Sequence, residues 1–336
     1  MIRHRSFLAL SIAALAGFAG VDSPSIKAAA SPPPTVSITR LTALNLSVVP
    51  GDFNGDGIID LASMSAPVPG TSDGSPQVSL GNGNGTFGTP IKANTYGHVV
   101  AVGDFNKDGK LDVLSATTAN DLAIEAGNGD GTLGTAHLVA ELEITNAFAA
   151  DVNGDGQLDV VALTDGTVYV YPGNGDFTFG APVQLTSGAL PLDGAVADLN
   201  GDGRNDIVVA NHFSDSISIF LNQGGLTFTA SDMPLDLNAN DVVARDINGD
   251  GKMDLVVAVS ESHSSAGPDF HTQGFAYVLL GNGVGTFAQP IKYRTAAGAW
   301  QIVLGDFTRD GVLDIATANR SSIVIDDCSR PLKTWD

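Results

Sequence analysis

Short apolar segments dominate the chain beyond its first 20 residues. No later stretch repeats its apolar residues with the 3.6-residue period of an amphipathic helix, and the 40 glycines and 16 prolines supply frequent turns. β-branched and apolar runs recur instead, as is typical of buried strands. These runs are Leu61–Met64, Val113–Ala116, Val160–Leu163, Ile207–Ala210, Leu255–Val259 and Ile315–Ala318. Each follows another strand-like run, at Ser47–Pro50, Val99–Val102, Ala147–Ala150, Ala195–Ala197, Asp241–Ala244 and Gln301–Leu304. The pattern predicts an all-β protein.

An acidic nine-residue pattern, DxNxDGxxD, separates the two runs of each unit. Its copies are Asp52–Asp60, Asp104–Asp112, Asp151–Asp159, Asp198–Asp206, Asp246–Asp254 and, with Thr308 in place of the Asn, Asp306–Asp314. The copies start about every 48 residues, a period that indicates a propeller blade or another repeat unit. A third strand such as Thr167–Tyr171, a glycine-rich turn such as Gly173–Phe179, and a fourth strand complete the unit.

Four antiparallel strands per unit predict a β-propeller, because repetition around a ring protects the sheet edges. The sixth unit departs from the pattern, since no glycine-rich turn and no fourth strand follow Asp326. The segment Thr35–Leu41 alternates like a strand, so it could pair with the last blade and close the ring. We expect six blades, and the alternative is a seven-bladed ring or a truncated one.

The N-terminus has the pattern of a secretory signal peptide. Arg3 and Arg5 precede an apolar run from Phe7 to Gly20, and a segment of small residues follows that ends at Ala30. We therefore expect residues 1–30 to be a signal peptide, although cleavage after Ala19 or Gly20 is the alternative, and residues 31–336 to be one propeller domain without a membrane span. The predicted location is extracellular, with a periplasmic or cell-surface position as further options. Cys328 is the only cysteine, so no intramolecular disulfide can form.

The acidic loops have the composition of sites for a hard cation. Positions 1, 3, 5 and 9 supply side-chain oxygens, position 7 can supply a backbone carbonyl, and a glycine at position 6 allows the sharp turn. The predicted ligands are Asp52, Asn54, Asp56, Ile58, Asp60; Asp104, Asn106, Asp108, Lys110, Asp112; Asp151, Asn153, Asp155, Gln157, Asp159; Asp198, Asn200, Asp202, Arg204, Asp206; Asp246, Asn248, Asp250, Lys252, Asp254; and Asp306, Thr308, Asp310, Val312, Asp314. Five or six Ca²⁺ ions are therefore expected, with metal-free Asp turns as the alternative.

The charge balance agrees with bound cations. The chain has 37 acidic and 16 basic residues and a net charge of −21, so six Ca²⁺ ions would offset about half of the net charge. An EF-hand is excluded because position 12 of the loops never holds a glutamate. Nucleic acid and anionic lipid are unsuitable partners, since both need a positive surface. We expect a monomer.

The sequence resembles the FG-GAP or VCBS repeat proteins, whose propeller is also found at the head of integrin α chains. The resemblance rests on the six Asp loops, the GNGxGTF-type turns and the residues after them, such as Gly180 and Pro182, and it covers about residues 36–325. It implies a calcium-binding propeller. The family includes adhesion modules, lectin-like propellers and some polysaccharide-degrading enzymes, so it implies the fold and calcium more firmly than the activity.

In an up-and-down blade the calcium turn and the glycine-rich turn share one rim, while the turns between the second and third strands and the links between blades share the other. Two insertions, Ser65–Gln77 and Ser260–Gln273, fall on that second rim. The longer insertion contains Glu261, His263, Asp269 and His271, which could bind a sugar, a peptide or a metal, or could simply be solvated.

These features favour a secreted calcium-binding module for adhesion or carbohydrate binding, with an extracellular glycan or protein as its ligand. A polysaccharide lyase or hydrolase is the alternative, but outside the Asp loops we find no paired acid and base for it. HExxH, P-loop and CxxC motifs are absent from the sequence, and we expect no enzyme activity. A purely structural surface protein is a third option.

Overall fold

The chain is described by a computed structural model over residues 11–12, 47–65, 74–116, 121–261, 273–296, 298–319 and 323–326. Within these ranges every element of regular secondary structure is a β-strand, and the strands form six sheets. No described residues form a helix that is long and apolar enough to cross a membrane.

The strands of each sheet follow one another in chain order. The first sheet contains β1 (Ser11–Ile12), β2 (Ser47–Gly51), β3 (Asp60–Met64), β4 (Pro76–Ser79) and β5 (Ile91–Lys92). The second contains β6 (His98–Gly103), β7 (Asp112–Ala116), β8 (Asp121–Gly127) and β9 (Leu133–Glu141), and the third contains β10 (Asn146–Ala150), β11 (Asp159–Thr164), β12 (Thr167–Tyr171) and β13 (Val183–Thr186). The fourth contains β14 (Pro191–Ala197), β15 (Asp206–Asn211), β16 (Ser216–Asn222) and β17 (Phe228–Pro234). The fifth contains β18 (Asn238–Arg245), β19 (Asp254–Ser260), β20 (Gly274–Leu279) and β21 (Ile291–Thr295), and the sixth contains β22 (Ala299–Gly305), β23 (Asp314–Asn319) and β24 (Ile323–Asp326).

Each sheet from the second to the fifth is an antiparallel meander of four strands, as the repeat predicts for a propeller blade. The ninth residue of every acidic loop begins the strand that follows the loop. The sixth sheet has three described strands, in agreement with its missing glycine-rich turn.

The second strands explain why the sequence runs are continuously apolar: both of their faces are buried between blades. Val113 of β7 lies in one cluster with Ala62 and Val78 of the first sheet, whereas its neighbour Leu114 lies in another with Val160 of the third sheet. The same alternation produces an apolar cluster between each later pair of sheets, up to the fifth and sixth. Burying one such side chain stabilises the fold by roughly 1.5–3 kcal/mol, so these interfaces hold the blades together.

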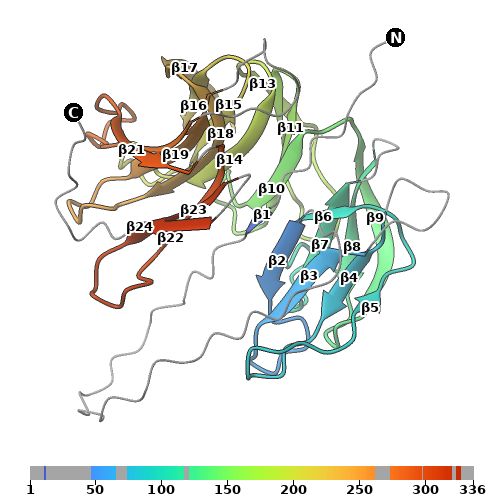
Figure 1. Ribbon diagram of the computed structural model, residues 1–336. Coiled ribbons are helices and arrows are strands. Elements are labelled where there is room, and N and C mark those ends of the chain that lie inside the picture. The colour runs from blue at the N-terminus through green and yellow to red at the C-terminus, as the bar shows by residue number, and fades with distance from the viewer. Residues whose placement is uncertain are drawn as a thin grey trace, which may run out of the picture.

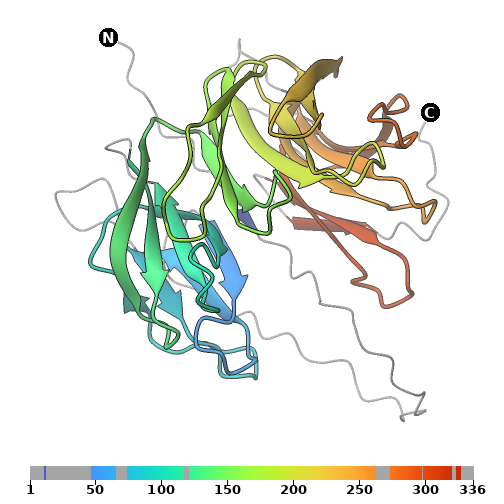
Figure 2. The ribbon, with the colours of Figure 1, turned by 180° about the vertical axis from the view of Figure 1, so that it is seen from behind.

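The first strands of consecutive sheets contact one another in the order β2, β6, β10, β14, β18 and β22. Figures 1 and 2 show the sheets following this order around the molecule, with the sixth sheet (red) returning towards the first (blue). The two-residue strand β1 pairs in parallel with β2 and also contacts β22. β1 belongs to the segment predicted as a signal peptide. The segment Thr35–Leu41, predicted to close the ring, lies outside the described residues.

Candidate metal centres and the second rim

The first acidic loop is a tight turn in which backbone N–H groups bind the carboxylate at position 1. Asp52 Oδ1 accepts hydrogen bonds from the N–H groups of Gly55 (2.8 Å) and Asp56 (3.2 Å), and its Oδ2 accepts one from Gly57 (2.8 Å). Asn54 Oδ1 accepts a bond from the same Asp56 N–H at 3.0 Å. Gly57 has a φ of +80°, a left-handed conformation in which a Cβ would be strained. The side-chain oxygens at positions 1 and 3 therefore converge on one point.

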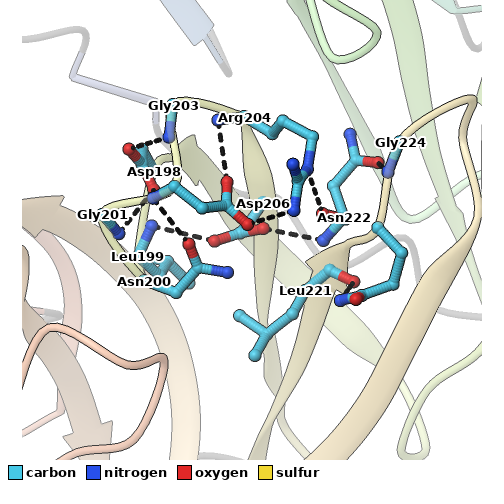
Figure 3. A network of polar contacts seen from close by, with 12 residues as sticks. Asp198, Leu199, Asn200, Gly201, Gly203, Arg204, Asp206, Leu221, Asn222 and Gly224 are labelled. Carbon is cyan, nitrogen blue, oxygen red and sulfur yellow. Dashed lines mark hydrogen bonds and ion pairs between the residues drawn. The ribbon is translucent and has the colours of Figure 1, made fainter.

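The other loops repeat this geometry. In the fourth loop, shown in Figure 3, Asp198 Oδ1 accepts bonds from Gly201 (2.7 Å) and Asp202 (3.1 Å), and Asp198 Oδ2 accepts one from Gly203 (2.8 Å). The Arg204 guanidinium pairs with Asp202 and donates from Nε to the carbonyl of Asn222 at 2.8 Å. Lys110 likewise lies 3.3 Å from Asp108. A cation at position 7 thus neutralises the carboxylate at position 5 in these two loops.

The carboxylate at position 9 joins the acidic loop to the glycine-rich turn of the same unit. Asp159 Oδ2 accepts bonds from Val152 (2.9 Å) and Asn153 (3.2 Å) in its own loop, while Oδ1 accepts one from Gly173 (2.8 Å), the first residue of the glycine-rich turn. Position 9 is fully buried in all six loops (Asp60, Asp112, Asp159, Asp206, Asp254, Asp314). These bonds place both turns at one rim and give position 9 a structural role that the sequence pattern did not reveal.

The sixth loop shows what the missing turn removes. Asp314 Oδ2 accepts bonds from Phe307 (2.7 Å) and Thr308 (2.9 Å), as in the complete units. Its Oδ1 is buried and has no hydrogen-bond partner in the described structure. The sequence could have indicated this, since no glycine-rich turn follows the sixth loop to supply the N–H group.

The two kinds of carboxylate in a loop differ in their electrostatic environment. Hydrogen bonds from loop N–H groups, that of Gly251 above all, lower the pKa of Asp246 at position 1 below its usual value. Burial raises the pKa of Asp112 at position 9 to about 6, although the N–H groups of Gly127 and Phe105 oppose the shift. The half-buried position 1 carboxylate of Asp246 is therefore ionised at neutral pH, as a cation ligand must be.

Only some of the predicted metal-ligand oxygens are arranged as a cation site requires. Oxygens at positions 1 and 3 converge, and each retains lone pairs for a metal. In the described residues, however, no group of three or more His, Cys, Asp or Glu side chains could hold a metal ion as arranged. Position 9 contributes to this result because its carboxylate is directed at backbone N–H groups. The metal ligands named from the sequence remain a prediction.

The ligand residues predicted in the longer insertion are mostly outside the described structure. His263, Asp269 and His271 lie in the undescribed range 262–272. Glu261 is half-buried at the end of the fifth sheet's second strand, and its N–H donates to the Gln273 carbonyl at 3.1 Å.

The second rim contains a polar and aromatic network that joins blades four, five and six. His212 Nδ1 lies 2.7 Å from Asn240 Oδ1, and its ring centroid lies 5.8 Å from that of Trp300. Asn240 Nδ2 also donates to Ser260 Oγ (2.8 Å) and to the Ala299 carbonyl (2.7 Å). All three network side chains, His212, Asn240 and Trp300, are buried. They tie three blades together at this rim.

A carboxylate pair near this network was missed by the sequence reasoning. Asp193 of β14 and Asp241 of β18 occupy equivalent positions, five residues before the first Asp of their loops. Asp241 Oδ2 accepts the Ile302 N–H of the next blade at 2.8 Å, and Asp193 Oδ1 accepts the Gly194 N–H at 2.8 Å. Burial raises the pKa of Asp241 to about 6, and desolvation together with the Asp241 charge raises the pKa of Asp193 well above its usual value. Aligning the repeats on this position would have revealed the pair.

A second unexpected carboxylate, Glu125, lies between blades one and two. It is 1% exposed, and its Oε1 accepts the Ser115 hydroxyl at 2.9 Å. Its Oε2 has no partner that meets the geometry of a hydrogen bond in the described structure, and neither does the neighbouring Thr95 Oγ1. Burial raises the pKa of Glu125.

These features define a propeller of four-stranded blades whose loops carry repeated acidic turns. FG-GAP-like repeats match residues 52–115, 104–162, 151–209, 198–257 and 264–317, and an FG-GAP repeat matches residues 238–279. The chain belongs to the FG-GAP-like repeat family. No curated protein matches the sequence.

Several solved structures share the fold. An Agrocybe aegerita lectin that recognises non-reducing terminal N-acetylglucosamine is similar with a TM-score of 0.55 and 23% identity, over 83% of this chain and 79% of the lectin. BBS1N, in complex with ARL6DN, gives a TM-score of 0.51 with 12% identity over 83% of this chain and 89% of BBS1N. The Vibrio cholerae biofilm matrix protein Bap1 gives 0.49 with 19% identity over 83% of this chain and 50% of Bap1. At these identities the likeness to the lectin and to BBS1N supports the propeller fold alone.

Proposed function

We propose that this protein is a calcium-stabilised extracellular module that binds glycan. The observation that carries the proposal is the acidic turn, repeated in six units with the same backbone N–H bonds to the position 1 carboxylate. A rigid turn that presents ionised carboxylates is suited to a hard cation, and a rigid ring leaves the opposite rim available for a ligand.

Calcium would be held by the side-chain oxygens at positions 1, 3 and 5, the carbonyl at position 7 and the lone pairs that remain on position 9. When bound it would neutralise neighbouring carboxylates within each loop. The cations at position 7, such as Arg204 and Lys110, would then give up the position 5 carboxylate to the metal. The N-terminal segment 1–30 would direct export, which agrees with a site that is filled at extracellular calcium concentrations.

A glycan is the preferred ligand class because the acidic surface does not suit an anionic partner. The Agrocybe aegerita lectin with the same fold recognises terminal N-acetylglucosamine, so glycans that end in this sugar are the first probe. An adhesion role would follow from binding such a glycan on a cell surface or matrix.

The first test is thermal unfolding of refolded residues 31–336 with EGTA and with millimolar Ca²⁺, combined with a count of bound metal. A ligand that binds only the folded state raises the free energy of unfolding by about 2.7 kcal/mol at 100 times its Kd. In a domain of this size each kcal/mol raises Tm by roughly 2–4 °C, so several occupied sites should increase Tm by about 10 °C or more. The expected result is such an increase with five or six ions per chain. An unchanged Tm with no bound metal would refute the calcium proposal. A glycan array on the calcium-loaded protein then tests the ligand class.

Asp193 and Asp241 favour a second candidate, a polysaccharide-active enzyme. An acid and base pair needs two neighbouring carboxyl groups, and both of these have raised pKa values. Asp241 already binds the Ile302 N–H of the next blade, which favours a structural role. Release of reducing ends or unsaturated products from polysaccharides, abolished by Asp193→Asn, would establish the enzyme; no turnover by the calcium-loaded protein would exclude these substrates.

A further inference from the structure

One corner of the second rim is built unlike the rest of the repeats. It consists of residues 187–190, in the link from blade three, and residues 212–215, in the turn between β15 and β16; we call it the blade four corner. His212 N–H donates to the Leu190 carbonyl (2.9 Å), and Phe213 N–H donates to the Ala189 carbonyl (3.1 Å). Ala189 N–H in turn donates to Ser214 Oγ (2.6 Å). The two segments are therefore held together by three hydrogen bonds in both directions.

Two residues of this corner have a left-handed backbone at positions where another unit has glycine: Leu190 corresponds to Gly298 (φ 72°) of the sixth unit, and Asp215 to Gly166 (φ 78°) of the third. Leu190 has a φ of 49° and Asp215 a φ of 47°. The other described non-glycine residues with positive φ are Lys107, Phe177, Leu226 and Arg309, which occupy positions in the acidic loops and glycine-rich turns where other units have glycine. Side chains in the left-handed region persist only when the surroundings enforce it, and such strain is found at functional sites. Blade four thus differs from these units in placing side chains, those of Leu190 and Asp215, where the others have glycine.

The blade four corner exposes an aromatic ring. Phe213 is 61% exposed, and its ring centroid lies 4.9 Å from that of the buried His212. His212 forms a hydrogen bond with Asn240 of blade five, and its ring packs against the ring of Trp300 of blade six. Exposing a phenyl ring to water is unfavourable in free energy. Phe213 nevertheless remains exposed next to His212, whose contacts join three blades.

Fixed carboxylates lie in the same network. Asp165 Oδ1 accepts the Leu190 N–H at 3.0 Å, and Asp215 Oδ1 accepts the Asn238 side-chain amide at 2.8 Å. Each carboxylate has a second oxygen that can accept a hydroxyl hydrogen. A single ring beside polar acceptors is too small an apolar area for a stable protein interface, which needs a larger patch. The negative charge disfavours anionic ligands.

We propose that the blade four corner binds a neutral sugar residue, with Phe213 stacking on the apolar face of the sugar and Asp165 and Asp215 accepting its hydroxyl groups. A sugar presents C–H groups on one face and hydroxyl donors around its edge, and the corner offers an exposed ring, with the carboxylate of Asp215 in the same turn and that of Asp165 hydrogen-bonded to Leu190. The inference rests on the proposed glycan-binding function and assigns its site, away from the insertion that contains Glu261.

The test measures binding of the calcium-loaded chain to immobilised N-acetylglucosamine-terminated glycans and to the other neutral glycans of the array. Phe213→Ala should weaken binding about tenfold or more, since an aromatic contact contributes on that scale. Phe213→Trp should retain it. Tyr96→Ala is the matched control: Tyr96 is also an exposed aromatic, 52% exposed, in the link between β5 and β6. This control should bind like the wild type, and all variants should keep the same Tm with calcium.

The outcomes separate the two proposals. Wild-type binding that Phe213→Ala leaves unchanged would overturn the site while the glycan-binding function stands. Equal losses in Phe213→Ala and Tyr96→Ala would also overturn the site. If the wild type binds no glycan, the proposed function is wrong and the proposed site is wrong with it. If the wild type instead binds a protein that Phe213→Ala does not bind, the ligand of the corner is a protein and the sugar proposal is overturned.

Discussion

The aspartate at position 9 illustrates how one residue type serves two purposes in these loops. Asp at position 1 is half-buried in five of the six loops and Asp at position 5 is exposed, and both are suited to a cation, whereas Asp at position 9 is buried and accepts N–H groups from two turns. A carboxylate is needed there because both of its oxygens accept hydrogen bonds; an amide would direct a donor at another donor. Position 9 should therefore matter for stability even without metal.

The chain provides a matched pair to test this. Asp159→Asn places an NH₂ group against either Gly173 or the loop N–H groups, so calcium-free protein should lose about 1–3 kcal/mol of unfolding free energy, the cost of an unsatisfied buried group. Asp314→Asn should cost much less, because Asp314 Oδ1 has no described partner and the amide can take its place. Urea unfolding in EGTA measures both changes. Equal losses would show that the bond to the glycine-rich turn contributes nothing.

At the scale of strands, the sequence was sufficient for most of the fold. The apolar runs predicted as second strands coincide with β7, β11, β15 and β19. These strands are buried on both faces, so nearly all of their residues are apolar and the strands stand out in the sequence. The repeat located the acidic loops because glycine and aspartate positions recur there. Contacts between blades were not visible in the same way: Asp193, Asp241 and Glu125 each depend on a neighbour distant in sequence. The exposed Phe213 was not recognised because its turn belongs to no repeated motif.

The sixth sheet should be the least protected part of the ring. Its second strand has Ala316 and Ala318 half-buried, whereas the equivalent Val208 and Ala210 of β15 are fully buried. β24 is the last described strand of a three-stranded sheet, so its outer edge lacks the pairing that β16 obtains from β17.

Hydrogen exchange measured by mass spectrometry should therefore detect faster exchange in β23 and β24 than in β15 and β16 of the calcium-loaded protein, because amides open locally where fewer contacts cover them. β11, fully buried along most of its length, serves as an internal reference. Protection of β23 and β24 equal to that of β15 would mean that another segment completes the sixth sheet in solution, as predicted for Thr35–Leu41.

At the scale of the whole molecule, stability is governed by where the many acidic groups lie. Carboxyl groups at the interfaces between blades, Glu125, Asp193 and Asp241, have raised pKa values, chiefly through burial. Aspartates in the turns, such as the exposed Asp130 and Asp176 and the half-buried Asp246, have lowered pKa values through hydrogen bonds to their carboxylates. Asp241, with a pKa near 6, gains a proton between pH 7.5 and 5, and so does Asp112 at position 9 of its loop, so acidification in this window acts on a blade interface and on a buried loop carboxylate.

The sign of the pH effect on stability should consequently depend on calcium. In calcium-free protein the interface groups bind more protons when folded than when unfolded, so stability is lost as pH rises through their folded pKa values, near 6 for Asp241, and Tm should be higher at pH 5.5 than at pH 7.5. Glu125→Gln, whose amide can donate to Thr95 Oγ1, should raise Tm at pH 7.5 and reduce this slope, whereas Asp232→Asn, at an exposed position, should do neither. With saturating calcium the gain on acidification should shrink or reverse, because protons compete with the metal for carboxylates. Differential scanning calorimetry in both conditions measures the slopes.

A calcium-free protein that loses stability from pH 7.5 to 5.5 would contradict this prediction. It would show that ionisation of the buried carboxyl groups does not destabilise the fold at neutral pH, and that any repulsion relieved by calcium lies in the loops alone.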